Sequence, residues 1–183
     1  MRMGRAKLLL PWGGTTVIGQ LLAQWREIGV GQVAVVLRAE DVALAAELDR
    51  SDFSKTERIS NPQPDRGMFS SILCAANWDG WRPEITHWAI VLGDQPHLKL
   101  EALRSLLEFA AQNREVISQP AYGGRTGHPV ILPKMAFEGL KSTAAETLKG
   151  YLSAHGSVQC SVSDPGLTLD MDTPEDYKRL QAS

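Results

Sequence analysis

An aspartate stands directly after one of the apolar runs of this chain. Asp94 belongs to Gly93-Asp94-Gln95-Pro96, which follows the apolar segment HWAIVL. If that segment is a buried strand, the carboxylate lies at its carboxyl end, where ligand sites assemble in α/β sheets. Hydrated Mg²⁺ is usually held by one or two carboxylates plus substrate phosphates, so Asp94 needs only one distant partner. The alternative is a plain turn, which Gly, Asp and Pro all favour.

The segment LDMDTPEDY offers that partner near the end of the sequence. Asp170 and Asp172 stand two positions apart in a strand-like stretch, which would turn both side chains to the same side. Thr173 and Pro174 are typical of a helix N-terminus, so capping explains the helix start. Capping does not require two alternating acids before it, and we therefore favour Asp172 as the second metal ligand.

Cations gather at the start of the sequence, in a chain without overall positive charge. Arg2, Gly4, Arg5 and Lys7 precede an apolar segment. Such a cluster can hold phosphates, with lysine as a point charge and arginine as a fork. The alternative is a solvated basic terminus.

A polar loop, NPQPDRGMFSS, leads into a predicted helix. Gly67 and the backbone amides after it can receive an anion or a sugar hydroxyl at the helix N-terminus. Ser70 and Ser71 are otherwise ordinary residues of a first helical turn.

A turn between two predicted strands contains Arg125, Thr126, Gly127 and His128. His128 either binds an acceptor phosphate or hydrogen-bonds the backbone. One histidine without a Cys or His neighbour is poor evidence for a zinc site.

Alternating strands and helices must position these residues. Apolar periodicity and turn signals predict helices over about 15–28, 41–49, 67–77, 99–112, 135–140 and 144–154 and from Thr173 onward, and strands over 32–37, 87–92, 115–120, 128–133 and 158–162. We read 51–65 as a polar connection. This alternation predicts an α/β domain with a largely parallel sheet, and the absence of repeats and linkers predicts one domain over 1–183.

Composition narrows the function. The 183 residues carry 19 Lys and Arg against 21 acids, a net charge of −2, which does not indicate a nucleic-acid or anionic-membrane binder. Cys74 and Cys160 are too few for a disulfide scaffold and are expected to be free thiols in a reducing cytoplasm. No apolar window reaches membrane-spanning length, and the start is too weakly apolar for a secretory signal, so we expect a cytoplasmic protein.

The ordered series RMGRAKLLLP, NPQPDRGMFSS, VLGDQP, YGGRTGHPV and LDMDTPEDY resembles the molybdenum cofactor nucleotidyltransferases, most closely their cytidylyltransferase branch. The resemblance implies a Rossmann-like nucleotidyltransferase domain, with a mostly parallel sheet and helices on both faces. It also implies Mg²⁺-dependent transfer of CMP from CTP to the terminal phosphate of molybdopterin, with pyrophosphate released. A molybdenum hydroxylase of the xanthine dehydrogenase type is the implied recipient.

The resemblance also implies roles for individual residues. It gives Asp94 and Asp172 to Mg²⁺, and Lys7 to catalysis beside them. The nucleotide-binding residues it implies are Arg2, Gly4, Lys7, Asn61, Gly67, Met68, Ser70 and Ser71, and we assign the acceptor to Arg125, Gly127 and His128.

The sequence departs from the family pattern in two places. A buried strand and a glycine-rich loop normally precede R-M-G and are missing before Met1, so we expect the native start to lie upstream. The segment KSTAAETLKGYLSAHG replaces a G-D-x-G-x-R stretch that commonly follows G-H-P-V. Three rivals therefore stay open: a GTP-using guanylyltransferase, a catalytically weak protein that binds and delivers the cofactor, and a relative of the nucleotide-sugar pyrophosphorylases.

Overall fold

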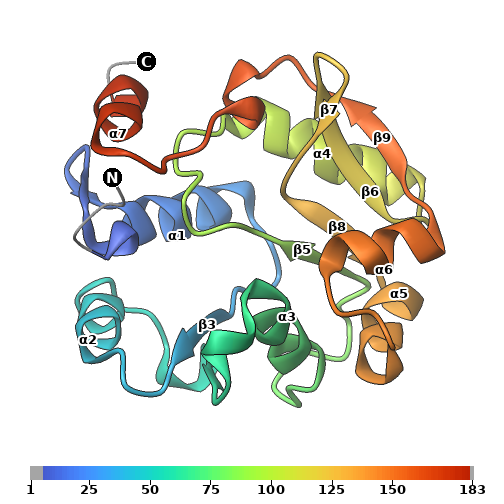
Figure 1. The fold of residues 1–183 in the computed structure, drawn as a ribbon, viewed down its shortest axis with the longest axis horizontal. Helices are drawn as coiled ribbons and strands as arrows, with labels where there is room; N and C mark the ends of the chain where they lie inside the picture. The colour runs from blue at the N-terminus through green and yellow to red at the C-terminus, as the bar shows by residue number, and fades with distance from the viewer. Residues whose placement is uncertain (1–5, 182–183) are drawn as a thin grey trace.

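Strands of two separate sheets form the centre of the molecule (Figure 1). The computed structural model describes residues 6–181. The larger sheet has the order β5 (His87–Ile90), β8 (Val130–Pro133), β6 (Ser118–Tyr122), β7 (Arg125–Thr126), and β9 (Val158–Ser161) also pairs with β6. A second pair joins β3 (Val35–Arg38) to β4 (Arg58–Asn61) in parallel, and a short antiparallel hairpin joins β1 (Pro11–Trp12) to β2 (Thr15–Thr16).

Strand directions in the larger sheet are mixed. β8 runs antiparallel to both β5 and β6, while β9 runs parallel to β6. Consequently β5, β6 and β9 point the same way, while β7 and β8 point the opposite way. The predicted α/β class with a mostly parallel sheet is confirmed.

Seven helices surround the strands in the described part of the chain: α1 (Val17–Ile28), α2 (Val42–Arg50), α3 (Met68–Ala76), α4 (Leu100–Gln112), α5 (Lys134–Gly139), α6 (Leu148–His155) and α7 (Pro174–Gln181). Helix α1 shows why the predicted bounds hold. Thr16 caps it by accepting a hydrogen bond from the Gly19 N–H, and Gly29 ends it in the left-handed conformation. The capping signals therefore set both ends of this helix.

Helices cover both faces of the larger sheet. On β8, Val130 and Leu132 point into a core formed with α3, α5 and α6, while Ile131 points to the opposite face and packs against α4. All four residues of β8 are buried. This alternation confirms the expected helices on both faces.

The β3–β4 pair and the larger sheet share an apolar core, but no backbone hydrogen-bond ladder joins them in the part of the chain that the structure describes. Val36 of β3 and Ile59 of β4 pack in the same apolar cluster as Trp88 of β5 and Val130 of β8. Within residues 6–181, however, no backbone-paired strand joins β3 to β5. Side-chain packing therefore carries much of the contact across this boundary.

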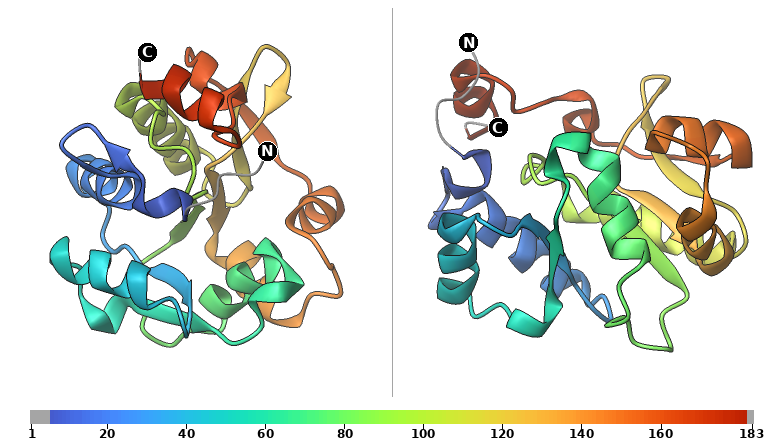
Figure 2. Two further views of the ribbon diagram at one scale, coloured as in Figure 1. Left: turned by 60° about the vertical axis from the view of Figure 1, so that its left-hand side comes forward. Right: turned by 60° about the horizontal axis from the view of Figure 1, so that its bottom comes forward.

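The two ends of the described chain lie side by side, as both views of Figure 2 show. The Gln181 side-chain amide donates a hydrogen bond to the Pro11 carbonyl at 2.9 Å, and the Tyr177 hydroxyl donates to the same oxygen. Met171 is fully buried beside Val17 of α1. This packing brings the segment that precedes α7 next to the 3₁₀ turn at Lys7–Leu9.

Several sequence-based predictions were wrong in detail. The polar reading of 51–65 missed β4, because Ile59 is its single strongly apolar residue and the burial of Asn61 depends on tertiary partners. The β1–β2 hairpin was also missed. The stretch before Thr173 is not a strand, although the buried Met171 does alternate with exposed Asp170 and Asp172. The predicted helix over 144–154 starts at Leu148, because Thr147 caps it.

Two other expectations concern cysteines and membranes. Cys74 and Cys160 are free thiols, Cys160 being buried. Between residues 6 and 181 we find no helix long and apolar enough to cross a membrane.

Candidate active site

Lys7 joins the two predicted metal-binding carboxylates. Its Nζ lies 2.5 Å from Asp172 Oδ1 and 3.6 Å from Asp94 Oδ2, although 165 positions separate Lys7 from Asp172. Leu8, the next residue, lies directly against Gly93, which places Lys7 beside the end of β5. The structure thus brings together all three residues assigned to catalysis.

The surroundings of Lys7 favour its charged form. Partial burial lowers the pKa of Lys7, but the hydrogen bond to Asp172 and the negative charges of Asp94 and Asp172 outweigh burial and raise it above its ordinary value. The side chains of Lys7 and Asp94 are each about one-third exposed, and that of Asp172 is 69% exposed. The ammonium group is therefore a fixed positive charge at a site open to solvent.

The same two carboxylates fit a hard divalent cation. Their oxygens converge on one positive group, the Lys7 ammonium, and carboxylate oxygens are ligands that Mg²⁺ prefers. Among the described residues, no cluster of three or more His, Cys, Asp or Glu could hold a metal. A site with two protein carboxylates suits an ion that retains water and takes substrate phosphates as its other ligands.

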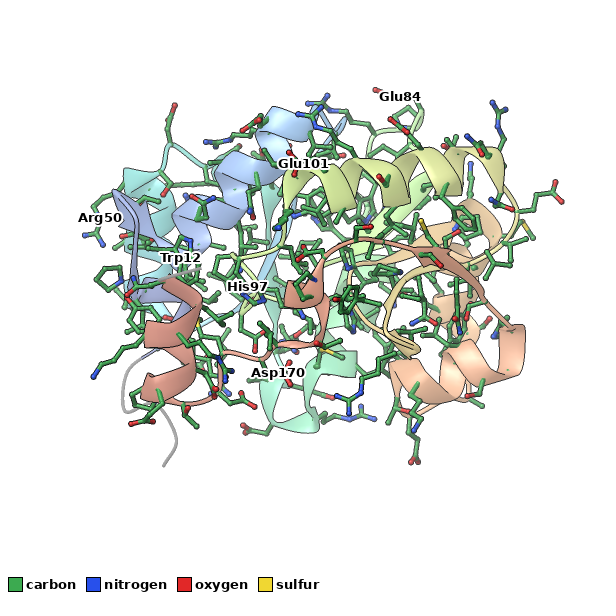
Figure 3. The ribbon with its side chains drawn as sticks, turned by 90° about the horizontal axis from the view of Figure 1, so that it is seen from above. Trp12, Arg50, Glu84, His97, Glu101 and Asp170 are labelled. Atoms are coloured by element: carbon green, nitrogen blue, oxygen red, sulfur yellow. The ribbon has the colours of Figure 1, made fainter. Side chains whose placement is uncertain are left out.

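Asp170 is not part of this cluster. It lies on the segment leading into α7 (Figure 3), and no hydrogen bond or ion pair joins it to the described chain. The preference for Asp172 over Asp170 therefore agrees with the geometry.

The predicted nucleotide loop is organised by Asn61. This residue is only 2% exposed, and its Nδ2 donates to the Ser70 hydroxyl at 2.8 Å and to the Ser71 hydroxyl at 3.0 Å. Its Oδ1 accepts a hydrogen bond from the Gln63 N–H at 2.8 Å. Because these partners use its polar atoms, Asn61 supports the loop from inside.

The first turn of α3 follows that loop. Gly67 has φ +83°, a left-handed value that favours glycine, and the first turn of α3 has no side-chain cap. Met68 is 49% exposed. The Gly67 N–H donates to the Pro64 carbonyl at 3.1 Å, so the backbone amides that an anion could reach are those after it, beginning with Met68.

The predicted acceptor residues lie at the β6–β7 hairpin and after it. Arg125 is exposed, while the Gly127 N–H donates to the Pro120 carbonyl at 3.1 Å and closes the hairpin. His128 Nδ1 donates to the Ile90 carbonyl at 3.1 Å. Burial lowers the pKa of His128, although the bond to Ile90 and the charge of Asp94 oppose that shift. A neutral imidazole therefore lies within electrostatic reach of Asp94.

Part of the predicted phosphate-binding cluster lies outside the described residues. This applies to Arg2, Gly4 and Arg5, and the role of the cluster remains a prediction.

Sequence reasoning missed the residue that holds the Asp94 loop from α1. Gln24 is 7% exposed, and its Nε2 donates to the carbonyls of Pro96 and Leu98 at 2.9 and 3.0 Å. A glutamine within the apolar stripe of a helix was the available signal, since a buried amide must find partners.

Comparisons with known proteins agree with this geometry. The model of the MobA-like NTP transferase domain family matches residues 1–158. A search of the curated proteins found no match.

Solved structures share the fold along nearly the whole chain. The crystal structure of Rv0371c from Mycobacterium tuberculosis H37Rv in complex with manganese is 28% identical, with a TM-score of 0.71 over 98% of this chain and 94% of that chain. Molybdopterin-guanine dinucleotide biosynthesis protein A from Archaeoglobus fulgidus is 18% identical, with a TM-score of 0.73 over 99% and 91%. A cytidylyltransferase from Leptospira borgpetersenii is 19% identical, with a TM-score of 0.71 over 100% and 80%.

A nucleotidyltransferase fold thus carries a lysine and two carboxylates at the carboxyl edge of its sheet, and the family model covers most of the sequence. The chain belongs to the MobA-like NTP transferase domain family and is a nucleotidyltransferase.

Proposed function

We propose that this nucleotidyltransferase moves CMP from CTP to the terminal phosphate of molybdopterin, with Mg²⁺ as its metal. The observation that carries the proposal is the convergence of Asp94 and Asp172 on Lys7. The resemblance of RMGRAKLLLP to the cytidylyl branch supports CTP as the donor. The manganese in the Rv0371c structure supports a divalent metal in this family.

The proposed reaction is a direct displacement at phosphorus. A terminal phosphate oxygen of the acceptor forms a bond to the α-phosphorus of CTP, and the bond from that phosphorus to the bridging oxygen of the β-phosphate breaks. Pyrophosphate leaves with the bonding electron pair, so no covalent enzyme intermediate is needed. When bound, Mg²⁺ supplies neutralisation of the charge on the phosphates.

The residues divide this work by position. Asp94 and Asp172 would hold the metal, and Lys7 donates hydrogen bonds to the phosphates that gather negative charge. Gly67 lets the chain turn into α3, and the backbone amide of Met68 after it would face the nucleotide, with the loop held from inside by Asn61. Positioning and charge neutralisation are the usual means of catalysis in phosphoryl transfer, so no acid–base residue is required.

The residues at and after the β6–β7 hairpin favour binding of the acceptor beside Asp94. Arg125 is an exposed guanidinium that can pair with a phosphate, and His128 lies close enough to interact with Asp94. A molybdenum hydroxylase would receive the finished cofactor.

The test is a transfer assay with purified protein, Mg²⁺ and molybdenum-loaded molybdopterin, in which pyrophosphate and the dinucleotide product are measured with CTP or GTP. We expect higher kcat/KM with CTP. A higher kcat/KM with GTP would show that GTP is the nucleotide donor and that the protein is a guanylyltransferase. Binding of the pterin without transfer from either nucleotide would instead support a delivery protein.

A further inference from the structure

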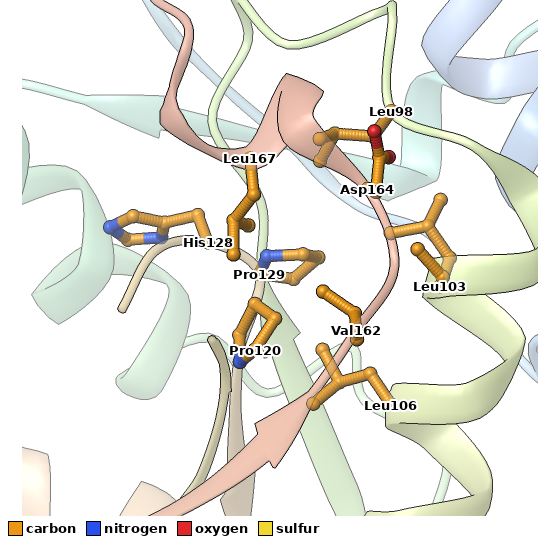
Figure 4. Close-up of a pocket in the computed structure, with 10 residues that line it drawn as sticks. Leu98, Leu103, Leu106, Pro120, His128, Pro129, Val162, Asp164 and Leu167 are labelled. Atoms are coloured by element: carbon orange, nitrogen blue, oxygen red, sulfur yellow. The ribbon is translucent and has the colours of Figure 1, made fainter. Parts of the chain in front are cut away.

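Asp164 is a buried acid outside the set of residues assigned above. It follows β9 and is 2% exposed. Its Oδ2 accepts a hydrogen bond from the Lys99 N–H at 2.8 Å, and its Oδ1 accepts one from the Gly166 N–H at 2.9 Å. Figure 4 shows Asp164 beside Leu98, at the end of the loop that carries Asp94.

These bonds connect two segments that are far apart in sequence. The loop that follows β5 contains Asp94 and ends at Lys99. The segment that leads to Asp172 begins with Asp164 and Gly166. A second bond crosses the same junction, because His97 Nε2 donates to the Gly166 carbonyl at 3.0 Å. The loop with one metal-binding carboxylate is thus tied to the segment with the other.

The close approach leaves no room for a larger residue at position 166. A Cβ on Gly166 would lie 2.9 Å from Asp164 Oδ1 and 3.0 Å from His97 Cδ2. Both contacts are with residues that cross the junction. The glycine therefore allows the carboxylate and the imidazole to reach it together.

A hollow borders the Asp94 loop on the side that faces α1 and α7. A hollow of about 620 Å³ borders Pro96, His97 and Leu98, between the β1–β2 turn, α1 and α7. Figure 3 shows Trp12 and His97 in this part of the molecule. Beside this hollow, Pro96 is fully buried and Leu98 packs with Trp25, while hydrogen bonds with Gln24 and Asp164 fix the backbone of the loop.

We propose that Asp164 is a positioning residue that sets the separation of Asp94 and Asp172 by locking their two segments together. The proposal rests on the metal site of the proposed function. Mg²⁺ tolerates little departure from its octahedral geometry, so a shift of either segment weakens its binding. Supporting residues of this kind typically change metal affinity by about 10–100-fold when they are replaced.

Asp164→Asn is the sharpest variant, because the amide keeps the size of the side chain. The two backbone N–H groups reach different oxygens of Asp164, so in the variant the amide oxygen replaces only one acceptor and the amide NH₂ faces the other N–H. Mn²⁺ binding with CTP, measured by electron paramagnetic resonance, should weaken by roughly 10–100-fold. Amide hydrogen exchange of residues 95–99 should speed up without any metal.

Asp41→Asn is the matched control. Asp41 caps α2 by accepting a hydrogen bond from the Leu44 N–H at 3.0 Å, and within the described residues it makes no bond to either of the two segments that carry Asp94 and Asp172. Because Asn caps a helix about as well as Asp, we expect this variant to keep the Mn²⁺ binding and the exchange of residues 95–99 of the wild type. A purely stabilising role for Asp164 would make the two variants alike, and that outcome would overturn the proposal.

Two further measurements make the result decisive. If Asp164→Asn does not fold, His97→Gln tests the other bond across the junction, and unchanged Mn²⁺ binding in that variant also overturns the proposal. Failure of the metal site itself has a different signature, because the wild type and Asp94→Asn would then bind Mn²⁺ equally poorly. If Asp94→Asn loses Mn²⁺ binding while Asp164→Asn binds Mn²⁺ normally, the metal site stands and only the positioning role of Asp164 is refuted.

Discussion

The loop before α3 and the β6–β7 hairpin present their polar groups in opposite ways. In the first, Asn61 is buried and bonded to Ser70 and Ser71, so that side chains inside the protein hold the shape of the loop. In the second, the hairpin is closed by backbone bonds, and Arg125 extends into solvent. Substitutions in the first region should therefore act through loop shape, and substitutions in the second through direct contact with a ligand.

The largest loss of activity is expected from substitutions of the two carboxylates, which lie in neither region. Replacing Asp94 or Asp172 by alanine should lower kcat/KM by roughly 10³-fold, because charge stabilisation by a bound metal is worth several kcal/mol. Pyrophosphate release measures the activity, and circular dichroism checks the fold. Asp170→Ala is the control and should remain near wild-type activity. Near-normal turnover of either variant would remove that residue from the metal site.

Asn61→Ala should change both stability and nucleotide binding. The substitution leaves the Gln63 N–H without its acceptor and removes the donor to the two serine hydroxyls, at a cost of about 1–3 kcal/mol in the free energy of unfolding. The KM for CTP should rise by roughly tenfold, since ~1.4 kcal/mol of lost binding corresponds to that factor. Urea unfolding and initial rates give the two quantities. Asn77→Ala, at the other end of α3, should leave the KM unchanged; an equal rise there would refute the role of loop shape.

Arg125→Ala tests the opposite behaviour of the hairpin. The KM for the molybdopterin acceptor should rise several-fold through loss of a charge-assisted hydrogen bond, while stability changes by less than about 0.5 kcal/mol, as is usual for exposed positions. Steady-state kinetics and thermal unfolding measure these effects. Arg114→Ala, which removes an exposed arginine before the other end of β6, is the control. A stability loss comparable to that of Asn61→Ala would show that the two regions do not differ as described.

The smallest effect concerns the pH dependence of stability through His128. Its pKa is lowered in the folded state by burial, so the unfolded chain binds the proton more readily. Stability from this group is fully present above the ordinary pKa of 6.5 and is lost as pH falls toward the folded pKa. Unfolding measured between about pH 5 and 7 should show a shallower decline for His128→Gln than for the wild type. His87, whose pKa burial also lowers, should maintain part of the slope in both proteins; identical slopes would exclude a contribution from His128.

Local signals made much of the fold predictable. The bounds of α1 follow from Thr16 and Gly29, which cap the helix within its own sequence. Strand β4 lacks such signals: the backbone of Asn61 pairs with β3, and its side chain depends on serines that follow it by nine and ten positions. A polar residue buried by distant partners looks like a loop residue when only its neighbours are considered.

The residues of the candidate site were predictable where residue type and position along the chain together indicate a chemical role. Asp94 and Asp172 were selected as carboxylates beside a strand end and a helix start, and the structure brings both to Lys7. Asp164 was not selected, because the Asp-Pro-Gly pattern around it reads as an ordinary start of a 3₁₀ turn. Its bond to the Lys99 N–H spans 65 positions and leaves no local signature.

The boundary between β3 and β5 has a consequence for how the protein opens. Backbone ladders make neighbouring strands unfold together, and the described chain has none at this boundary. Gln32 spans it near one end through bonds with the Gly80 carbonyl and the Arg82 N–H, both at 2.9 Å. The β3–β4 unit can therefore loosen as a cooperative group of its own, with amide protons that exchange earlier than those of buried β8. The β3–β4 unit, which leads into the nucleotide loop, would then sample open states while the larger sheet, which carries the acceptor hairpin, stays closed.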